Sequence, residues 1–295
     1  MASFQLVGLL LASFLLQIAG SEQTVPTTHE GLSTTARVLP KHGFVANKCV
    51  FILATGHSGS TALMDALNQL PNYLIRGEQY AAIWNIYESY MNFNWTIADP
   101  LSQLKFNWSE RPHATFKEVK DLYDKEAVTE KLPWFNEFNL DRIMAAARTY
   151  YAILYGYYGK GFVSGFKDSR YVCGESFESW RCAEVFNGFM TFLRKLCLDV
   201  KVVFNTRTSD SFESNTRLFH QMARFSVDEF SKNLKETHRL FNDYAKNNPD
   251  LAFHVFYEEM YDAQKNATLA RNLLQFLKED PSFPIRFTRM PASRS

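Results

Sequence analysis

Short apolar runs alternate with longer segments of helical periodicity along most of this chain of 295 residues. The clearest run, residues 50–54, is followed by a turn rich in Gly, Ser and Thr, and then by apolar positions spaced along one helix face from Ala62 to Leu70. Further strands are predicted at residues 73–76, 162–167, 200–206 and 251–256. Helical spacing predicts helices at residues 80–93, 140–155, 175–198, 227–246 and 268–278.

This alternation predicts the fold class. Strands separated by helices of this length need right-handed crossovers, which bring the strands into one mainly parallel sheet. We therefore predict a single α/β domain, residues 48–295, with helices flanking the sheet. Residues 94–138 are polar, irregular and rich in Trp, and they predict an exposed insertion with some helix.

The N-terminal 47 residues lack the alternation of strand and helix patterns that the rest of the chain shows. Residues 6–19 form an apolar run that ends in small residues, so residues 1–20 are typical of a signal peptide or a short signal anchor. The run is short for a membrane span, which needs about 20 apolar residues. Residues 21–47 are rich in Thr, Ser, Gly and Pro without periodicity, which predicts a disordered stem. Contact with a membrane is expected only through the possible anchor.

Composition narrows the class of protein. The net charge of +1 argues against a nucleic-acid partner. Three N-x-Ser/Thr sequons begin at Asn94, Asn107 and Asn266. Together with the N-terminal segment, they predict a glycoprotein of the secretory pathway, in the Golgi lumen or secreted.

The four cysteines predict disulfides more than metal chemistry. Their even number permits two bridges with three possible connectivities, and none has CxxC spacing. We expect Cys173–Cys182 as one bridge, with buried free thiols as the alternative. We predict no metal site.

Polar side chains follow each predicted strand, at the point where the strand ends. They are residues 56–61, Glu78, Lys167, Arg207 and Glu258. In a parallel α/β sheet the carboxyl ends of the strands meet at one edge, where ligands bind. Residues 56–61 also precede a helix, an arrangement that points backbone amides at an anion. Each residue also has an ordinary interpretation, such as a helix cap or a solvated strand end.

Five short motifs resemble those of the sulfotransferases that use 3′-phosphoadenosine 5′-phosphosulfate (PAPS), particularly the lumenal Golgi type that includes tyrosylprotein and carbohydrate sulfotransferases. The motifs are spread over residues 48–280, at residues 57–61, 76–78, 165–168, 202–207 and 257–260 with 274–277. The chain departs from the family at His57, where Arg is usual. It departs again at Asn215, eight positions after Arg207, where Ser is usual.

The resemblance implies a P-loop-like turn that binds the 5′-phosphosulfate, and transfer of a sulfuryl group from PAPS to a hydroxyl or amine of a carbohydrate or protein acceptor. It implies that Glu78 takes the acceptor proton and that Lys167 donates to the bridging or transferring oxygen. Arg207 and Asn215 are expected at the 3′-phosphate, and no metal is required. The residues expected around the 5′-phosphosulfate are His57, Ser58, Gly59, Ser60, Thr61 and Ala62.

Other interpretations stay open at this point. Residues 56–60 resemble the Gly-x-Ser-x-Gly elbow of α/β-hydrolases, with Ser58 as nucleophile, although the fifth position is Ser. A P-loop kinase is less favoured because the loop lacks a Gly-Lys-Ser/Thr ending. A third alternative is a sulfotransferase-like binding protein without turnover, which His57 and the altered segment after Arg207 favour.

Overall fold

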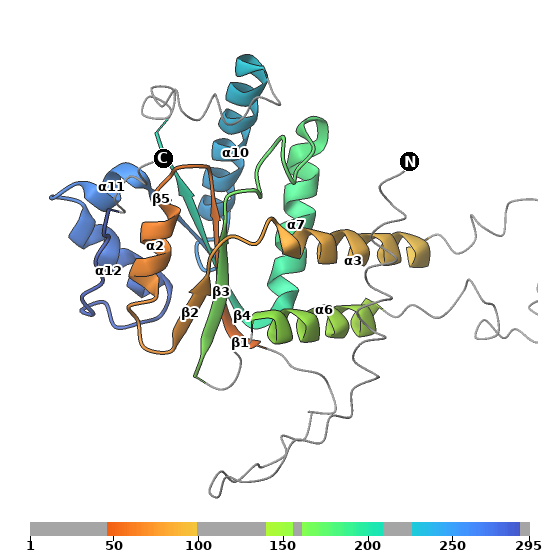
Figure 1. Ribbon diagram of the computed structural model, residues 1–295, viewed down its shortest axis with the longest axis horizontal. Helices are drawn as coiled ribbons and strands as arrows, with labels where there is room; N and C mark the ends of the chain where they lie inside the picture. The colour runs from red at the N-terminus through yellow and green to blue at the C-terminus, as the bar shows by residue number, and fades with distance from the viewer. Residues whose placement is uncertain (1–45, 99–139, 156–160, 209–225, 290–295) are drawn as a thin grey trace, which may run out of the picture. The chain divides into compact units, whose positions relative to one another are not determined.

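The computed structural model describes residues 46–98, 140–155, 161–208 and 226–289, and these form an α/β fold around one sheet (Figure 1). The five strands all pair in parallel, in the order β2-β3-β1-β4-β5. Their bounds are β1 Ala46–Ala54, β2 Tyr73–Arg76, β3 Val163–Asp168, β4 Cys197–Thr206 and β5 Ala252–Phe256. The predicted α/β class, with a parallel sheet and flanking helices, is confirmed.

Helices cover both faces of the sheet, because alternate side chains of each central strand point to opposite sides. Phe51 and Leu53 of β1 pack toward one face, and Val50 and Ile52 pack toward the other. All four are fully buried, which explains why the run reads as continuously apolar. The first face carries α3 (Ala82–Ala98), α6 (Leu140–Tyr155), α7 (Cys182–Leu196) and α10 (Val227–Asn247). The second carries α2 (Ser60–Leu67), α11 (Tyr257–Tyr261) and α12 (Asn266–Phe276).

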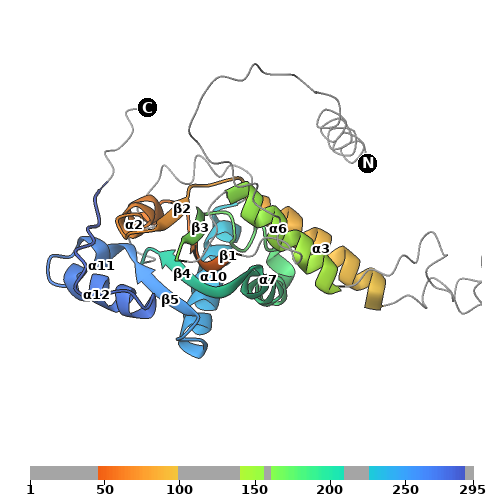
Figure 2. The ribbon, with the colours of Figure 1, turned by 90° about the horizontal axis from the view of Figure 1, so that it is seen from below.

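Aromatic rings fill the core on the first face. The Phe51 and Phe166 rings stack at 4.8 Å between centroids, and the Phe204 and Phe241 rings stack at 4.3 Å. Such pairs add about 0.5–1.5 kcal/mol to the stabilisation from burial alone. Figure 2 shows α3 and α6 side by side over this face. The many Phe residues therefore pack the helices against this face of the sheet.

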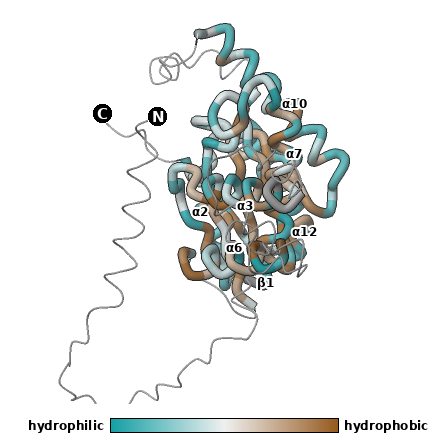
Figure 3. The backbone as a smooth tube through the Cα atoms, turned by 90° about the vertical axis from the view of Figure 1, so that its right-hand side faces the viewer, coloured by the Kyte–Doolittle hydropathy of each residue, from teal (hydrophilic) through white to brown (hydrophobic). Residues whose placement is uncertain are grey.

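Helix α10 shows how a mostly polar segment joins the core. Much of α10 is coloured as hydrophilic in Figure 3, whereas Leu240 and Phe241 are buried against the sheet. Ser226 caps the helix, since its hydroxyl accepts a hydrogen bond from the Glu229 amide at 3.2 Å.

Two boundaries differ from the prediction for one physical reason. The helix predicted at 175–198 begins only at Cys182, because Gly174 has a left-handed backbone (φ 84°) and the Cys173–Cys182 disulfide closes the preceding loop. The chain then enters β4 at Cys197, earlier than the predicted residue 200, and Cys197 forms the second disulfide with Cys49 of β1.

The expected Cys173–Cys182 bridge is confirmed. Two disulfides are typical of a secreted or lumenal protein. Within the described ranges no helix is long and apolar enough to cross a membrane. The predicted signal segment, residues 21–45 of the predicted stem, residues 99–138 of the predicted insertion and Asn107 lie outside the described residues. The last two residues assigned to the stem, Ala46 and Asn47, instead begin β1. Asn94 in α3 and Asn266 at the start of α12 are half-buried.

The topology separates the loops at the carboxyl end of β1. The loop after β1 leads to α2 on one face, whereas β3 and β4, its two neighbours, lead to α7 and α10 on the other. Adjacent loops that leave toward opposite faces open a crevice between them, where ligands of such sheets bind. The candidate site lies at this point.

Candidate functional site

Ser58 holds the loop between β1 and α2 through hydrogen bonds within the protein. The Ser58 hydroxyl lies 2.7 Å from both the Thr55 carbonyl oxygen and Asn205 Oδ1, and the Ser58 amide donates to the same carbonyl at 3.3 Å. Ser58 is fully buried. The amide and the hydroxyl of Ser58 are both used within the protein, so the expected contact of Ser58 with a ligand stays a prediction. Its burial also speaks against a nucleophilic role, which needs access to a substrate.

Glycine is required where the loop enters α2. Gly59 has a φ of 75°, and a Cβ at this position would lie 2.7 Å from Cδ2 of Tyr257. His57, with a φ of 55°, is held in the same left-handed region and is exposed. The loop is therefore packed tightly against α11 and presents His57 outward.

The N-terminus of α2 has no cap. Gly59 is the N-cap residue and offers no side chain, and no acidic residue lies in the first turn. The first amides of a helix have no partner within the helix, and here Ser60, Thr61 and Ala62 line a cavity. Thr55 lines the same cavity, and its buried Oγ1 has no hydrogen-bond partner among the described residues. These donors favour an anion at this point.

The cavity has a volume of about 1150 Å³ and collects the side chains predicted at the strand ends. The predicted site residues that line it are His57, Gly59, Ser60, Thr61, Ala62, Glu78, Lys167 and Arg207. Asn215 lies outside the described residues. Four Lys or Arg side chains line the cavity against two Glu, so the cavity is positive although the whole chain is nearly neutral.

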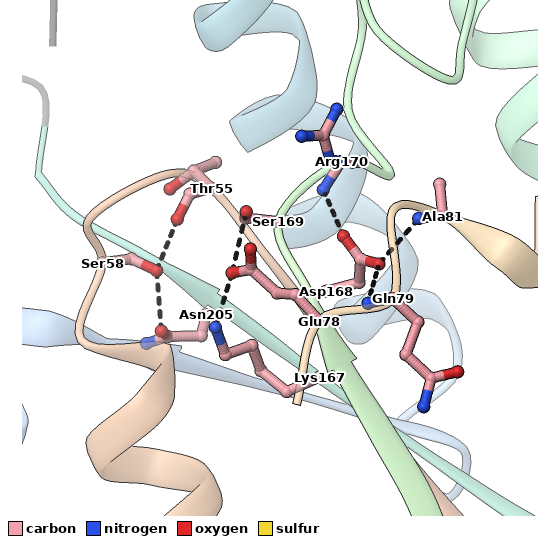
Figure 4. A network of polar contacts seen from close by, with 10 residues as sticks. All are labelled: Thr55, Ser58, Glu78, Gln79, Ala81, Lys167, Asp168, Ser169, Arg170 and Asn205. Carbon is pink, nitrogen blue, oxygen red and sulfur yellow. Dashed lines mark hydrogen bonds and ion pairs between the residues drawn. The ribbon is translucent and has the colours of Figure 1, made fainter. Parts of the chain in front are cut away.

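Lys167 and Glu78 form an ion pair at the ends of β3 and β2. Lys167 Nζ lies 2.5 Å from Glu78 Oε1, with the lysine side chain 7% exposed and the glutamate 43%. Ser169 donates to the same oxygen at 3.1 Å (Figure 4). Burial raises the pKa of Glu78, but the hydrogen bond and charge of Lys167, aided by Ser169 and Arg170, outweigh it and hold the pKa below its usual range.

Asp168 organises the turns that follow β2 and β3. This carboxylate is 2% exposed and accepts from the Ala81 amide at 2.9 Å, the Arg170 amide at 3.0 Å and, weakly, the Gln79 amide at 3.4 Å (Figure 4). It thereby ties the segment that carries Glu78 to the one that carries Arg170. Sequence reasoning missed this role, although an acidic residue at the end of a buried strand is a recognisable signal.

Arg207 directly follows β4 and lies over Tyr257 of α11. Its guanidinium carbon lies 3.9 Å from the centroid of the Tyr257 ring, and its buried Nε has no hydrogen-bond partner in the described ranges. Arg289 lies 4.8 Å from the neighbouring Tyr261 ring, and both residues also line the cavity. Two arginines held on tyrosine rings can bind a further anionic group. Sequence reasoning did not place Arg289 in the site.

Glu258, the fifth predicted strand-end residue, does not line the cavity. Its carboxylate accepts from the Thr208 amide at 3.2 Å and from the Thr208 hydroxyl at 3.3 Å. Because Thr208 follows Arg207 directly, Glu258 positions the arginine. The ordinary interpretation, a structural role, fits this residue.

Two half-buried histidines lie beneath the end of β4. His254 Nε2 is 2.9 Å from Thr206 Oγ1. Burial, together with the charge of His238, lowers the pKa of His254 to about 4. Burial also lowers the pKa of His238, against the opposing charge of Glu258. Neutral histidines therefore support the end of β4, which Arg207 follows directly.

Comparison with known proteins adds no relative: no family model and no curated protein matches the chain. Among the described residues no group of three or more His, Cys, Asp or Glu is arranged to hold a metal ion.

Proposed function

We propose that this chain is a sulfotransferase of the secretory pathway, in the Golgi lumen, that moves a sulfuryl group from PAPS to a hydroxyl or amine of a carbohydrate or protein acceptor. One observation carries the proposal. An uncapped helix N-terminus, a Lys–Glu pair and an arginine whose Nε has no partner among the described residues line the same positive cavity at the end of β1. The motif resemblance supplies the identity of the donor.

The residues present fit a donor with two anionic ends. The amides of Ser60, Thr61 and Ala62 would hold the 5′-phosphosulfate, in the manner of a P-loop-like turn, with Thr55 Oγ1 as a further donor. Arg207 would bind the 3′-phosphate through a forked contact that a lysine cannot copy, and Arg289 lies close enough to assist. When bound, PAPS supplies an activated sulfuryl group on a phosphate leaving group.

Lys167 and Glu78 have linked roles in this proposal. While Lys167 is paired with Glu78, the lowered pKa makes the carboxylate a weak base. An anionic sulfuryl oxygen in the cavity competes for the Lys167 ammonium. Movement of Lys167 toward that oxygen removes the cation from Glu78, raises the pKa of Glu78 and lets Glu78 take the acceptor proton. Binding of the donor thereby prepares the base.

A binding protein without turnover is the second candidate. It is favoured by His57 in place of the usual Arg, and by the close Lys167–Glu78 pair, which leaves Glu78 a weak base unless the pair separates. A hydrolase finds no support in the geometry, since Ser58 is buried and bonded to Thr55 and Asn205.

Thermal shift with 3′-phosphoadenosine 5′-phosphate (PAP), followed by transfer of radiolabelled sulfate from PAPS to mixed glycan and peptide acceptors, tests the proposal. We expect stabilisation by PAP and labelled product. Stabilisation without transfer to any acceptor supports the binding protein, and no stabilisation contradicts both. Arg142→Ala is a matched control, because this exposed arginine of α6 does not line the cavity.

A further inference from the structure

The turn after β2 is held in a strained conformation beside the Lys167–Glu78 pair. Tyr80 and Ala81 are consecutive non-glycine residues with positive φ, 53° and 55°. Each such residue costs about 1–3 kcal/mol, and such strain persists only where the surroundings enforce it. Here the Asp168 carboxylate enforces it through the Ala81 amide. The result is that the Tyr80 ring is 82% exposed, although it lines the cavity.

Arg170 lies over this exposed ring. Its guanidinium carbon is 4.7 Å from the Tyr80 ring centroid, and within the described ranges Arg170 forms no salt bridge. Asp168 fixes the Arg170 backbone as it fixes that of Ala81, so one buried carboxylate aligns both partners of the stack. Arg170 is close enough to help lower the pKa of Glu78. An arginine that is stacked but not ion-paired is ready for an anion from outside.

We propose that Tyr80 and Arg170 form an acceptor subsite for an acidic sugar residue, next to the base Glu78. The open face of the Tyr80 ring stacks on the C–H face of the sugar, and Arg170 pairs with the carboxylate of the sugar. This inference rests on the proposed sulfotransferase function, and it names the acceptor class: a glycan that carries uronic acids.

The surroundings favour a sugar over a peptide. Small polar side chains that suit sugar hydroxyl groups, Ser169, Ser176 and Asn233, line the same cavity as the stack. An extended peptide, by contrast, gains much of its affinity by pairing with the free edge of a sheet. The edge strands are β2 and β5, and what faces the stack is the carboxyl end of β2 and β3, not a strand edge.

The test compares two probes that differ only in charge. One is a hexasaccharide that alternates glucuronic acid with N-acetylgalactosamine, and the other is the same hexasaccharide with every carboxyl group reduced to an alcohol. We expect the full chain to bind the acidic probe about tenfold more tightly, as one charge-assisted pair implies. Equal binding of the two probes would overturn the proposal, and tighter binding of a Glu-rich peptide would overturn the choice of a sugar.

Variants of Arg170 and Tyr80 test whether their stack causes the preference for the acidic probe. Arg170→Ala should remove the preference for the acidic probe, Arg170→Lys should keep part of it, and Tyr80→Ala should weaken both probes alike. Arg142→Ala should change neither. A preference that survives in Arg170→Ala contradicts the assignment. PAP binding, measured in parallel, should stay within about twofold in every variant, since none of these side chains belongs to the proposed donor site.

The same titrations separate the two proposals. If the acidic probe binds with the expected preference but PAP does not bind, the subsite stands and the sulfotransferase proposal fails. If PAP binds and sulfate is transferred without any preference for the acidic probe, the subsite fails alone. The unfolding midpoint of each variant identifies one that has merely failed to fold.

Discussion

The ends of β1 and β4 differ from the ends of β2 and β3 in how their polar groups are satisfied. At β1 and β4, Ser58 and Asn205 pin the loop from below, yet Thr55 Oγ1, the α2 amides and Arg207 Nε are left without protein partners among the described residues. At β2 and β3, Lys167 neutralises Glu78, and the Asp168 carboxylate accepts hydrogen bonds from backbone amides of the turns after both strands.

This difference suggests that the two groups of residues respond differently to a bound ligand. Donors that lack partners are preorganised for an anion and need no rearrangement to bind it. A neutralised pair changes only when a ligand draws one member away. In the proposed reaction the groups at the ends of β1 and β4, the preorganised half of the site, bind the donor. The Lys167–Glu78 pair at the ends of β2 and β3, the reactive half, becomes reactive as a consequence of that binding. The predictions below separate these two behaviours, from the largest expected effect to the smallest.

Glu78→Gln should impair sulfate transfer without weakening the binding of PAP. Loss of a general base costs about 10²- to 10⁴-fold in turnover, so sulfate transfer should fall by that factor. PAP should bind at least as tightly as before, because Lys167 is no longer held by a carboxylate. Transfer rates and PAP titrations with the purified variant measure both effects. Turnover at the wild-type rate would reject Glu78 as the base.

Arg207→Ala should weaken the binding of PAP, because it removes the proposed contact to the 3′-phosphate. A hydrogen bond to a charged group contributes about 1.5–3 kcal/mol, so PAP affinity should fall about 10- to 100-fold. Adenosine 5′-phosphate, which lacks the 3′-phosphate, should bind the variant and the wild type equally. Calorimetric titration with the two nucleotides reads this out. Equal losses for both nucleotides would instead indicate a general disturbance of the α11 region.

The support beneath Arg207 should depend on pH. The pKa of His254 is about 4 in the folded protein, below the ordinary value of 6.5, so between these values the unfolded chain binds more protons. Its contribution is fully present above pH 6.5 and is lost as the pH falls toward 4, by about 2 kcal/mol at pH 5. Urea unfolding at pH 7 and pH 5 measures the loss. His254→Asn should reduce this pH dependence, and an unchanged profile in the variant would contradict the assignment.

The smallest effect concerns the loop itself. His57→Arg restores the residue usual in the sulfotransferase family and adds a fixed charge at an exposed position. Exposed charges contribute up to about 1 kcal/mol, so PAP affinity should rise by about two- to fivefold at low salt. The gain should fade as ionic strength increases. A loss of affinity in the variant would show that the left-handed backbone at His57 does not tolerate the substitution.

The sheet was predictable because its central strands β1 and β4 contain apolar runs between loops. Residues 50–54 and 200–206 are buried on both faces, and such runs need no knowledge of the partner strand. Boundaries were harder where covalent geometry overrides periodicity. Apolar residues after residue 175 continue a helical pattern, but the Cys173–Cys182 bridge and the left-handed Gly174 delay the helix to Cys182. The short α11 escaped prediction because five residues are too few for a periodic signal.

The site was predictable where a residue ends a strand, and not where it acts through a neighbour. Glu78, Lys167 and Arg207 lie at or just after the carboxyl ends of their strands, and the parallel sheet brings them to one cavity. Ser58 belongs to the right loop, but its inward direction depends on Asn205, which is 147 positions away in the chain. The stack of Tyr80 on Arg170 depends on Asp168 holding two turns at once, which no local pattern encodes.

Calorimetric titration of the wild-type chain with PAP and with adenosine 5′-phosphate is the most direct test of the proposed donor site. If the α2 amides and Arg207 bind the two anionic ends of the donor, PAP should bind at least about tenfold more tightly than the nucleotide without the 3′-phosphate. Failure to bind PAP, or equal binding of the two nucleotides, would contradict the account.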